Sequence, residues 1–348
     1  MDRSTLGDVT TAVLTGGDGP LTRRVTDLLA ADGDIRVVRL EGSLHPAGAT
    51  DEGGLSIEPP VESADVVIDL GASDHDARAQ QRQSASEFAT VTLAAADQLS
   101  ARQVVFVSSA MVYGASPNNP KPLTEEAVLR PDVEFVFARQ LASAEEMVEQ
   151  WRRERPGRRT AVLRPCLTLA SGSNSTLASA LVSGLGRRFA AVDPPSQFLH
   201  LDDLAAAIAL AIRRRLDGVF NVAPDGWVAG ERVRALSGDG FRVPMPDRLA
   251  DLWAGLRWRF LRGPIPPGLT SYTREPWIVA NGRLRHEGWE PVVTNEQAYV
   301  EATEARWWTL VSPQRRQELA LGAGGLLALA LVAVGVMVGR RWWRRSSR

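Results

Sequence analysis

The stretch that decides the fold is TTAVLTGGDGPLT, residues 10–22. The apolar run Thr10–Thr15 predicts a short buried strand, and three glycines follow it closely. From Leu21 to Ala31, apolar residues recur at helical spacing. Glycines between a strand and a helix let the backbone approach a phosphate, and the helix N-terminus offers it N–H groups. The stretch therefore predicts the first strand, turn and helix of a nucleotide-binding α/β fold.

Apolar runs and helical stretches continue to alternate after this unit. The expected strands are Ile35–Leu40, Ala64–Leu70, Gln103–Ser108 and Thr160–Leu163, and the expected helices are Ala85–Ser100 and Arg139–Arg153. Strands that alternate with helices form a parallel sheet with helices on both faces. We predict a Rossmann-like, doubly wound α/β fold.

Beyond residue 165 this alternation fades. A helix is expected over Asp202–Arg214, and Val243–Pro267 is rich in proline. The predicted organisation is a Rossmann dinucleotide-binding domain at 1–165, a smaller substrate-side subdomain at 166–310 interleaved with the Rossmann core, a linker at 311–318, a membrane helix at 319–339 and a basic tail at 340–348.

The membrane helix is predicted from a long uncharged segment. Leu319–Gly339 contains 21 residues without a charge, and about 20 apolar residues cross a bilayer core. RRWWRRSSR follows, with tryptophans that suit the membrane interface. No apolar signal sequence opens the chain. We therefore expect a protein at the cell membrane whose main domain lies in the cytoplasm. The helix would contact lipid, either as a tail anchor that crosses the membrane or by lying shallow at its surface.

Composition excludes several other classes. The chain has 348 residues, of which 44% are hydrophobic and 23% charged, so it can bury a large core. A formal net charge of -1 gives no basic field for nucleic acid. Cys166 is the only cysteine, and the four histidines have no metal-ligand spacing, so neither a disulfide nor a metal site is predicted.

Several motifs carry a resemblance to a known family. They are the glycine turn at Thr15–Gly19, SSAMVYG at Ser108–Gly114, LRP at Leu163–Pro165, FLHLDD at Phe198–Asp203 and GWEP at Gly288–Pro291. Together they resemble the extended short-chain dehydrogenases/reductases, and among them the NAD-dependent epimerases and dehydratases. The resemblance spans roughly residues 13–305 and implies a Rossmann fold that binds NAD and a nucleotide-sugar.

The glycine turn departs from the pattern T-G-x-x-G-x-x-G of that family. Gly16 and Gly19 match it, but Thr22 replaces the third glycine. Pro20 removes one N–H donor, and Asp18 brings a carboxylate near the expected phosphates. These changes should weaken cofactor binding, and the alternative is a turn that has kept its shape and lost its ligand.

Three further positions are expected to touch the cofactor. Glu41 follows the second strand, where an acidic residue bonds the ribose 2'-hydroxyl, so NAD is favoured over NADP. Leu70 and Gly71 lie where the family usually has H-L-A-A. Asp69 stands at the histidine position of that motif, which is another departure beside the cofactor.

The catalytic motif is incomplete. The resemblance makes Ser109 the serine that orients the substrate, but Phe137 and Leu141 occupy the positions of the Tyr-x-x-x-Lys pair. A tyrosine and a lysine at this spacing share one helix face, where the lysine lowers the tyrosine pKa for acid–base catalysis. Phenylalanine and leucine cannot do this, although both positions should face the cleft. Tyr113 is a weak candidate for a substitute acid, with a packing role as the alternative.

Three functions remain open from the sequence. The leading one is a membrane-associated family member that binds a dinucleotide or a nucleotide-sugar without the standard acid–base step, as a sensor or scaffold. The second is an active NAD-dependent sugar-nucleotide epimerase or oxidoreductase that uses Ser109 and Tyr113. The third is a non-catalytic structural subunit of a membrane complex. A homodimer is compatible with each of them.

Overall fold

The computed structural model describes residues 9–16, 19–40, 61–71, 85–170, 175–185, 193–236 and 268–304. The chain divides into two compact units, Met1–Ala302 and Thr303–Arg348. In the second unit only residues 303 and 304 are described, so the expected linker, membrane helix and basic tail lie outside the described residues. Within the described residues, no helix is both long and apolar enough to span a membrane.

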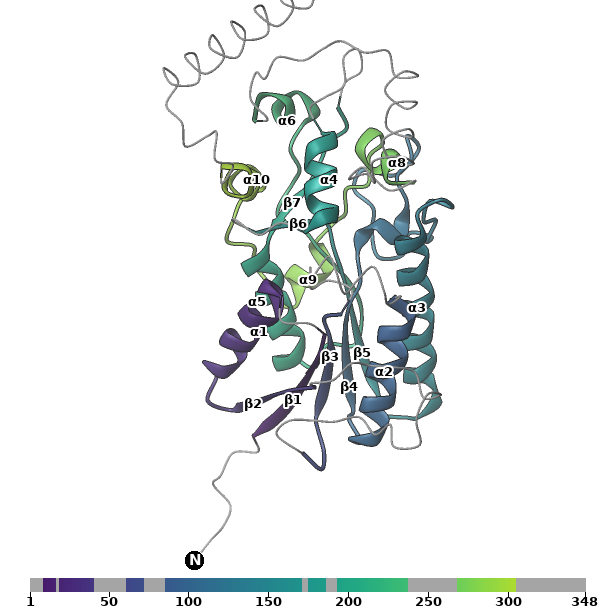
Figure 1. Ribbon diagram of the computed structural model, residues 1–348, viewed down its shortest axis with the longest axis vertical. Helices are drawn as coiled ribbons and strands as arrows, with labels where there is room; N and C mark the ends of the chain where they lie inside the picture. The colour runs from purple at the N-terminus through teal and green to yellow at the C-terminus, as the bar shows by residue number, and fades with distance from the viewer. Residues whose placement is uncertain are drawn as a thin grey trace, which may run out of the picture. The chain divides into compact units, whose positions relative to one another are not determined.

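A parallel six-stranded sheet forms the centre of the first unit (Figure 1). The strand order is β2-β1-β3-β4-β5-β8, and every neighbouring pair is parallel. The strands are β1 (Thr10–Thr15), β2 (Ile35–Arg39), β3 (Val66–Asp69), β4 (Gln103–Val107), β5 (Arg159–Pro165) and β8 (Gly218–Val222). The predicted parallel α/β fold is confirmed. Strand β8 was not predicted as a strand, because its sequence GVFNV contains a glycine and an asparagine that interrupt the apolar run.

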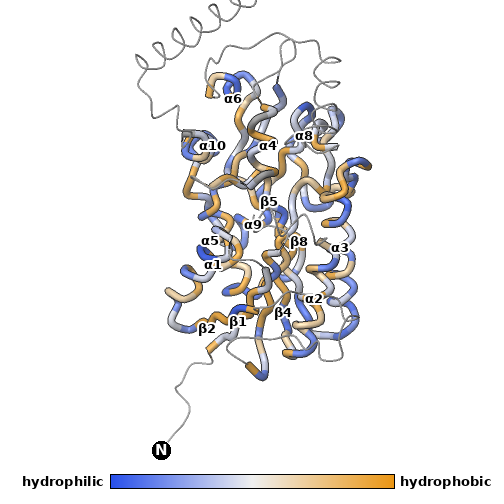
Figure 2. The backbone as a smooth tube through the Cα atoms, in the orientation of Figure 1, coloured by the Kyte–Doolittle hydropathy of each residue, from blue (hydrophilic) through white to orange (hydrophobic). Residues whose placement is uncertain are grey.

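Helices cover both faces of the sheet. On one face α1 (Pro20–Ala30) packs against α5 (Leu201–Arg213), and on the other α2 (Ala85–Gln98) packs against α3 (Val136–Glu154) (Figure 1). Hydrophobic stretches run along the central strands in Figure 2. Such continuous apolar strands are expected where a parallel sheet is buried on both faces. In β4, all five residues are buried.

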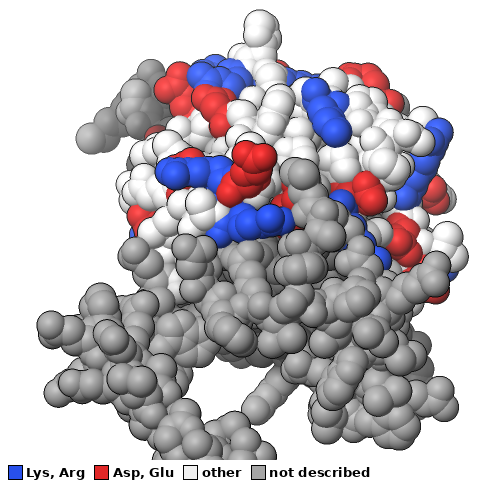
Figure 3. Space-filling view, turned by 90° about the horizontal axis from the view of Figure 1, so that it is seen from above, with Lys and Arg blue, Asp and Glu red and all other residues white. Residues whose placement is uncertain are grey.

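The remaining elements gather beyond the carboxyl ends of the strands (Figure 1). They are the 3₁₀ helix η1 (Ala110–Tyr113), strands β6 (Leu167–Leu169) and β7 (Phe198–His200), and helices α4 (Thr176–Gly184), α6 (Gly230–Leu236), α8 (Leu269–Arg274), α9 (Gly282–His286) and α10 (Asn295–Glu304). Acidic and basic side chains are interspersed on the described part of this end (Figure 3), where Arg232 of α6 pairs with Glu296 of α10 at 2.9 Å.

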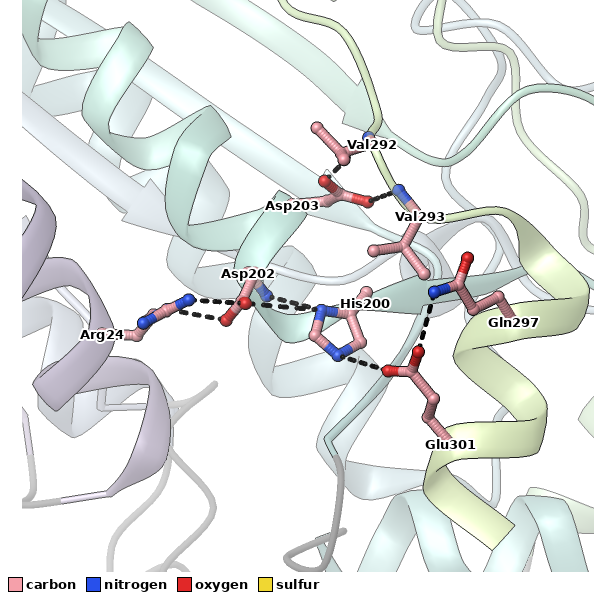
Figure 4. A network of polar contacts seen from close by, with 8 residues as sticks. All are labelled: Arg24, His200, Asp202, Asp203, Val292, Val293, Gln297 and Glu301. Carbon is pink, nitrogen blue, oxygen red and sulfur yellow. Dashed lines mark hydrogen bonds and ion pairs between the residues drawn. The ribbon is translucent and has the colours of Figure 1, made fainter. Parts of the chain in front are cut away.

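Polar contacts join the first helix to this end of the molecule (Figure 4). Arg24 of α1 donates two hydrogen bonds to the Asp202 carboxylate, both at 2.7 Å. Nδ1 of His200 accepts from the backbone N–H of Asp202 at 3.2 Å, and its Nε2 lies 3.5 Å from Oε2 of Glu301. The FLHLDD motif therefore ties α1 to α10.

The next residue of the motif anchors a loop. The Asp203 carboxylate accepts from the backbone N–H groups of Val292 and Val293, each at 3.0 Å (Figure 4). Its backbone carbonyl accepts from the indole N–H of Trp289 at 3.1 Å. The FLHLDD and GWEP motifs are thus in direct contact through Asp203 and Trp289.

Candidate functional site

The glycine turn lies at the point where the chain changes direction across the sheet. Strand β2 lies on one side of β1, and β3 lies on the other. In doubly wound sheets, ligands bind in the crevice at the carboxyl ends of strands at such a switch point. The ends of β1 and β3 that meet there are Thr15 and Asp69, which are register partners.

Gly16 has to be a glycine for this turn to close. Its φ is +131°, and a Cβ at this position would lie 2.9 Å from the backbone nitrogen of Gly71 and 3.2 Å from Cβ of Leu70. A Cβ on Gly71 would in turn lie 2.5 Å from the ring of Phe88. Three of the predicted cofactor positions, Gly16, Leu70 and Gly71, are therefore brought together.

The start of α1 is only partly described. Gly19 is the N-cap of the helix and Pro20 its first residue. Thr22 is 3% exposed, so the residue at the third glycine position is packed inside. Asp18 and Glu41 lie outside the described residues. The described glycines fit the close backbone approach that a dinucleotide needs, and Gly16, Gly19 and the N-terminus of α1 are the groups that would hold it.

Beneath the turn, a buried chain of hydroxyl groups ends on a carboxyl group. Thr15 Oγ1 donates to the carbonyl of Ile68 at 3.1 Å and lies 2.8 Å from Thr92 Oγ1, which is 3.0 Å from Oδ2 of Asp69. The other oxygen, Oδ1, accepts from the N–H of Gly71 at 2.9 Å. Burial raises the pKa of Asp69 to about 6.

Ser109 lies two residues after the end of β4, on the side of the sheet where the resemblance places it. It is the N-cap of η1, and its Oγ accepts a hydrogen bond from the backbone N–H of Met111 at 3.2 Å. The side chain is partly exposed. Its own hydroxyl proton is therefore still available to a ligand, because capping uses only a lone pair.

Phe137 and Leu141 lie on α3, four residues apart. Leu141 is 0% exposed and belongs to the main hydrophobic core. The expectation that both positions face the cleft is wrong for Leu141, because a leucine gains free energy by packing where a lysine would need water or a partner. Phe137 is half-buried and lies between this core and the second hydrophobic cluster.

Phe137 begins a row of aromatic rings toward the substrate side. Its ring centroid is 5.9 Å from that of Phe135, which is 5.4 Å from Tyr272, and Tyr272 is 5.7 Å from Trp277. Tyr272 and Trp277 also line a cavity of about 10 Å³, next to Cys166. A cavity of this size accommodates roughly one water molecule.

Tyr113 is part of a buried ionic network. Its hydroxyl donates to Oδ1 of Asn221 at 2.8 Å and accepts from Nη1 of Arg164 at 2.7 Å. Burial raises the pKa of Tyr113, and the side chain is 2% exposed. Because its proton is used inside the protein, the geometry favours the packing role over that of a substitute acid.

The same network holds an ion pair. Arg164 of β5 pairs with Glu145 of α3 at 2.6 Å, and both side chains are 6% exposed. Ser108 Oγ donates to Glu145 Oε1 at 2.5 Å. Glu145, which stands one helical turn after Leu141, was not predicted from the sequence. A charged residue on the apolar face of α3 was the signal that a buried partner exists.

Among the residues that the structure describes, no group of three or more His, Cys, Asp or Glu is arranged to hold a metal ion. The doubly wound sheet and the glycine turn at its switch point define a Rossmann-type fold. A profile of the NAD dependent epimerase/dehydratase family matches residues 12–223, and the chain belongs to this family. The resemblance seen in the sequence motifs is thereby confirmed.

Curated relatives match part of the chain. Uncharacterized proteins of Mycobacterium tuberculosis and Mycobacterium bovis are 26% identical over 220 residues. The matched part is 62% of this chain and spans only 58% of the length of these relatives.

Among solved structures, the chain is similar to UDP-glucose 4-epimerase of Thermotoga maritima with UDP-glucose, at a TM-score of 0.59 and 18% identity, covering 87% of this chain and 100% of the other. It is also similar to the Thermus thermophilus UDP-glucose 4-epimerase in complex with NAD, at a TM-score of 0.57 and 16% identity, covering 84% and 97%. The dTDP-glucose 4,6-dehydratase of Bacillus anthracis gives 0.55 and 16%, covering 86% and 96%. At these identities the likeness concerns the fold.

Proposed function

We propose that this protein binds NAD or a nucleotide-sugar at the glycine turn and acts as a sensor or scaffold without the family's Tyr-x-x-x-Lys acid–base step. The proposal rests mainly on two side chains of α3. Leu141 is fully buried in the core, and Phe137 is the first of a row of aromatic rings. Neither side chain exchanges a proton. Lys121, the only lysine of the chain, is exposed in a different segment.

The ligand class rests on the family and on its relatives with known structures. UDP-glucose is present in the Thermotoga maritima structure and NAD in the Thermus thermophilus structure. NAD, when bound, supplies a reversible hydride acceptor. In this chain, Gly16 and the N-terminus of α1 would hold the pyrophosphate, and Ser109 would offer its hydroxyl to the sugar.

The active-enzyme alternative has less support. It requires Tyr113 to deliver a proton to substrate, yet the Tyr113 hydroxyl is bonded to Asn221 and Arg164. A general acid has to lie within hydrogen-bond reach of the group that it protonates. The buried position of Tyr113 makes this step unfavourable.

Calorimetry tests ligand binding, with a matched pair of glycine variants. We expect NAD to bind the parent protein, and Gly16→Ala to abolish measurable binding because its Cβ would press on the 70–71 backbone. The control is Gly33→Ala, since a Cβ on Gly33 meets nothing within 4 Å. Equal affinities of all three proteins, each shown to be folded, would contradict binding at this turn.

Turnover is tested with UDP-glucose and dTDP-glucose. We expect no epimerisation or dehydration above background, because the absent acid–base groups are worth roughly 10²- to 10⁴-fold in rate. Ser109→Ala should then change nothing measurable in turnover. Activity in highly purified parent protein that is lost in Ser109→Ala or Tyr113→Phe would instead establish the active-enzyme alternative.

We also propose that the uncharged segment 319–339 holds the protein at a membrane. The full-length protein is expected to sediment with membranes after salt washing. Leu327→Arg together with Leu331→Arg should release it, because each arginine costs about 2.5–3.5 kcal/mol at the centre of a membrane helix. The matched control is Leu327→Ile with Leu331→Ile. Release of the control and the parent alike would exclude the anchor.

A further inference from the structure

Asp69 is a buried carboxyl group in the floor of the glycine turn. It ends β3 and is 1% exposed. Its neighbour across the sheet is Thr15, the last residue of β1 before Gly16. The Asp69 side chain also accepts from the N–H of Gly71, whose backbone is packed against Gly16. Asp69 therefore touches both chain segments that make the turn.

The number of protons in the chain of hydroxyl groups decides which protonation state of Asp69 fits the contacts. There are three contacts in a row, from Ile68 O to Thr15, from Thr15 to Thr92, and from Thr92 to Asp69, with oxygen separations of 3.1, 2.8 and 3.0 Å. Each threonine hydroxyl has one proton to donate. Two hydroxyl protons cannot fill three contacts, so an ionised Asp69 leaves one contact without a hydrogen.

A protonated Asp69 supplies the third proton. Asp69 then donates to Thr92, Thr92 donates to Thr15, and Thr15 donates to the Ile68 carbonyl, so every contact is a hydrogen bond. The second carboxyl oxygen continues to accept from Gly71. Thr15, Thr92 and Asp69 are each at most 2% exposed. Bulk water therefore does not reach them to supply a missing hydrogen bond.

The surroundings favour the neutral acid as well. Around the carboxyl group, β1 contributes Thr15, α2 contributes Thr92, and the β4 register partner is Phe106. No charged group of the described part contributes to the pKa of Asp69, which is raised by burial against the two hydrogen bonds that lower it. A buried carboxylate without a cation is costly, and protonation removes that cost.

We propose that Asp69 is a proton-linked positioning residue of the nucleotide turn. In its neutral form it completes the hydrogen-bond chain that fixes the contact of Gly16 with Gly71. Ionisation leaves Thr15 and Thr92 with two facing oxygens and one proton too few, which loosens the end of β1 next to Gly16. It also places a negative charge under the site of a pyrophosphate. Ligand binding at the turn is thus coupled to proton uptake by Asp69, a step that rests on the proposed function.

The protonation state itself is measured without a ligand. In the full-length protein, the ¹³C resonance of the Asp69 carboxyl carbon is expected to titrate near pH 6, and the amide resonances of Gly16 and Gly71 should follow the same curve. In Asp69→Asn these amides should not titrate, since the amide of asparagine can accept from Gly71 and donate to Thr92 at every pH. Titration of Asp69 at an ordinary aspartate pKa, about 3.9, overturns the inference.

The ligand arm uses NAD in calorimetry at about pH 6 and about pH 8. If only the neutral form binds, the parent affinity falls about 50-fold over this range, because the competent fraction falls from one half to about 1%. Asp69→Asn should show equal affinities at both pH values. Thr92→Val removes a hydroxyl from the hydrogen-bond chain, so this variant should bind NAD weakly at both pH values. The control Thr90→Val, on the exposed side of α2, should bind NAD as the parent does.

The two hypotheses fail in different ways. NAD that binds the parent equally well at both pH values overturns the proton coupling and leaves the proposed function intact. NAD that binds no variant at either pH overturns NAD binding at the turn and with it the coupling to Asp69, while the carboxyl titration still decides the protonation of Asp69.

Discussion

Arg164→Met is expected to lower the free energy of unfolding by about 3–5 kcal/mol, the usual cost of removing one partner of a buried ion pair. The substitution leaves the Glu145 carboxylate, 6% exposed, with Ser108 as its remaining side-chain donor. It also removes the donor to the Tyr113 hydroxyl. Urea unfolding followed by circular dichroism measures the change.

A matched control separates burial from charge. Arg153→Met removes an ion pair with Glu149 in which the arginine is 73% exposed, and exposed pairs contribute about 1 kcal/mol or less. In the double variant Arg164→Met with Glu145→Leu, much of the loss should be recovered, since no unpaired charge remains inside. A loss for Arg164→Met no larger than for Arg153→Met would show that water reaches the network.

The fold was predictable because local patterns and the sheet agree. Thr10–Thr15 was expected as a strand and is β1 with the same bounds, and α2 and α3 lie over the expected helical stretches. Each of these segments is buried along a face that its apolar spacing defines. Strand β8 was not predicted because Gly218 and Asn221 interrupt its apolar run, and its place in the sheet depends on pairing with β5, which is more than fifty residues away in the chain.

The site was predictable only where a motif names its residues. Gly16, Ser109 and the Phe137/Leu141 pair were found by their place in family motifs, and the structure locates them in the described part of the chain. The partners of buried polar groups were not found, because nothing in the sequence joins Asp69 to Thr92 or Glu145 to Arg164 before the fold is known. Buried polar residues indicate that partners exist without naming them.

Leu141→Lys is expected to be the most damaging single change on α3, although lysine is the residue that the family has there. Leu141 is 0% exposed in the main core, and burial lowers the pKa of a lysine by roughly 3–5 units. At neutral pH the variant should lose about 4 kcal/mol or more of unfolding free energy, since each unit corresponds to about 1.36 kcal/mol. Leu141→Met should cost less than about 1.5 kcal/mol.

The pH dependence identifies the cause of this loss. A lysine whose pKa is lowered in the folded state binds fewer protons there than in the unfolded state, so the stability of Leu141→Lys should rise with pH toward the unfolded pKa of about 10.4. Denaturant unfolding at about pH 6 and about pH 9 measures this, with Leu141→Met showing no such difference. If Leu141→Lys is as stable as the parent at both pH values, the lysine amine reaches water or a ligand, and this helix face opens to the cleft. Phe137→Tyr with Leu141→Lys would then be the variant in which to look for restored turnover, because both acid–base groups would stand beside Ser109.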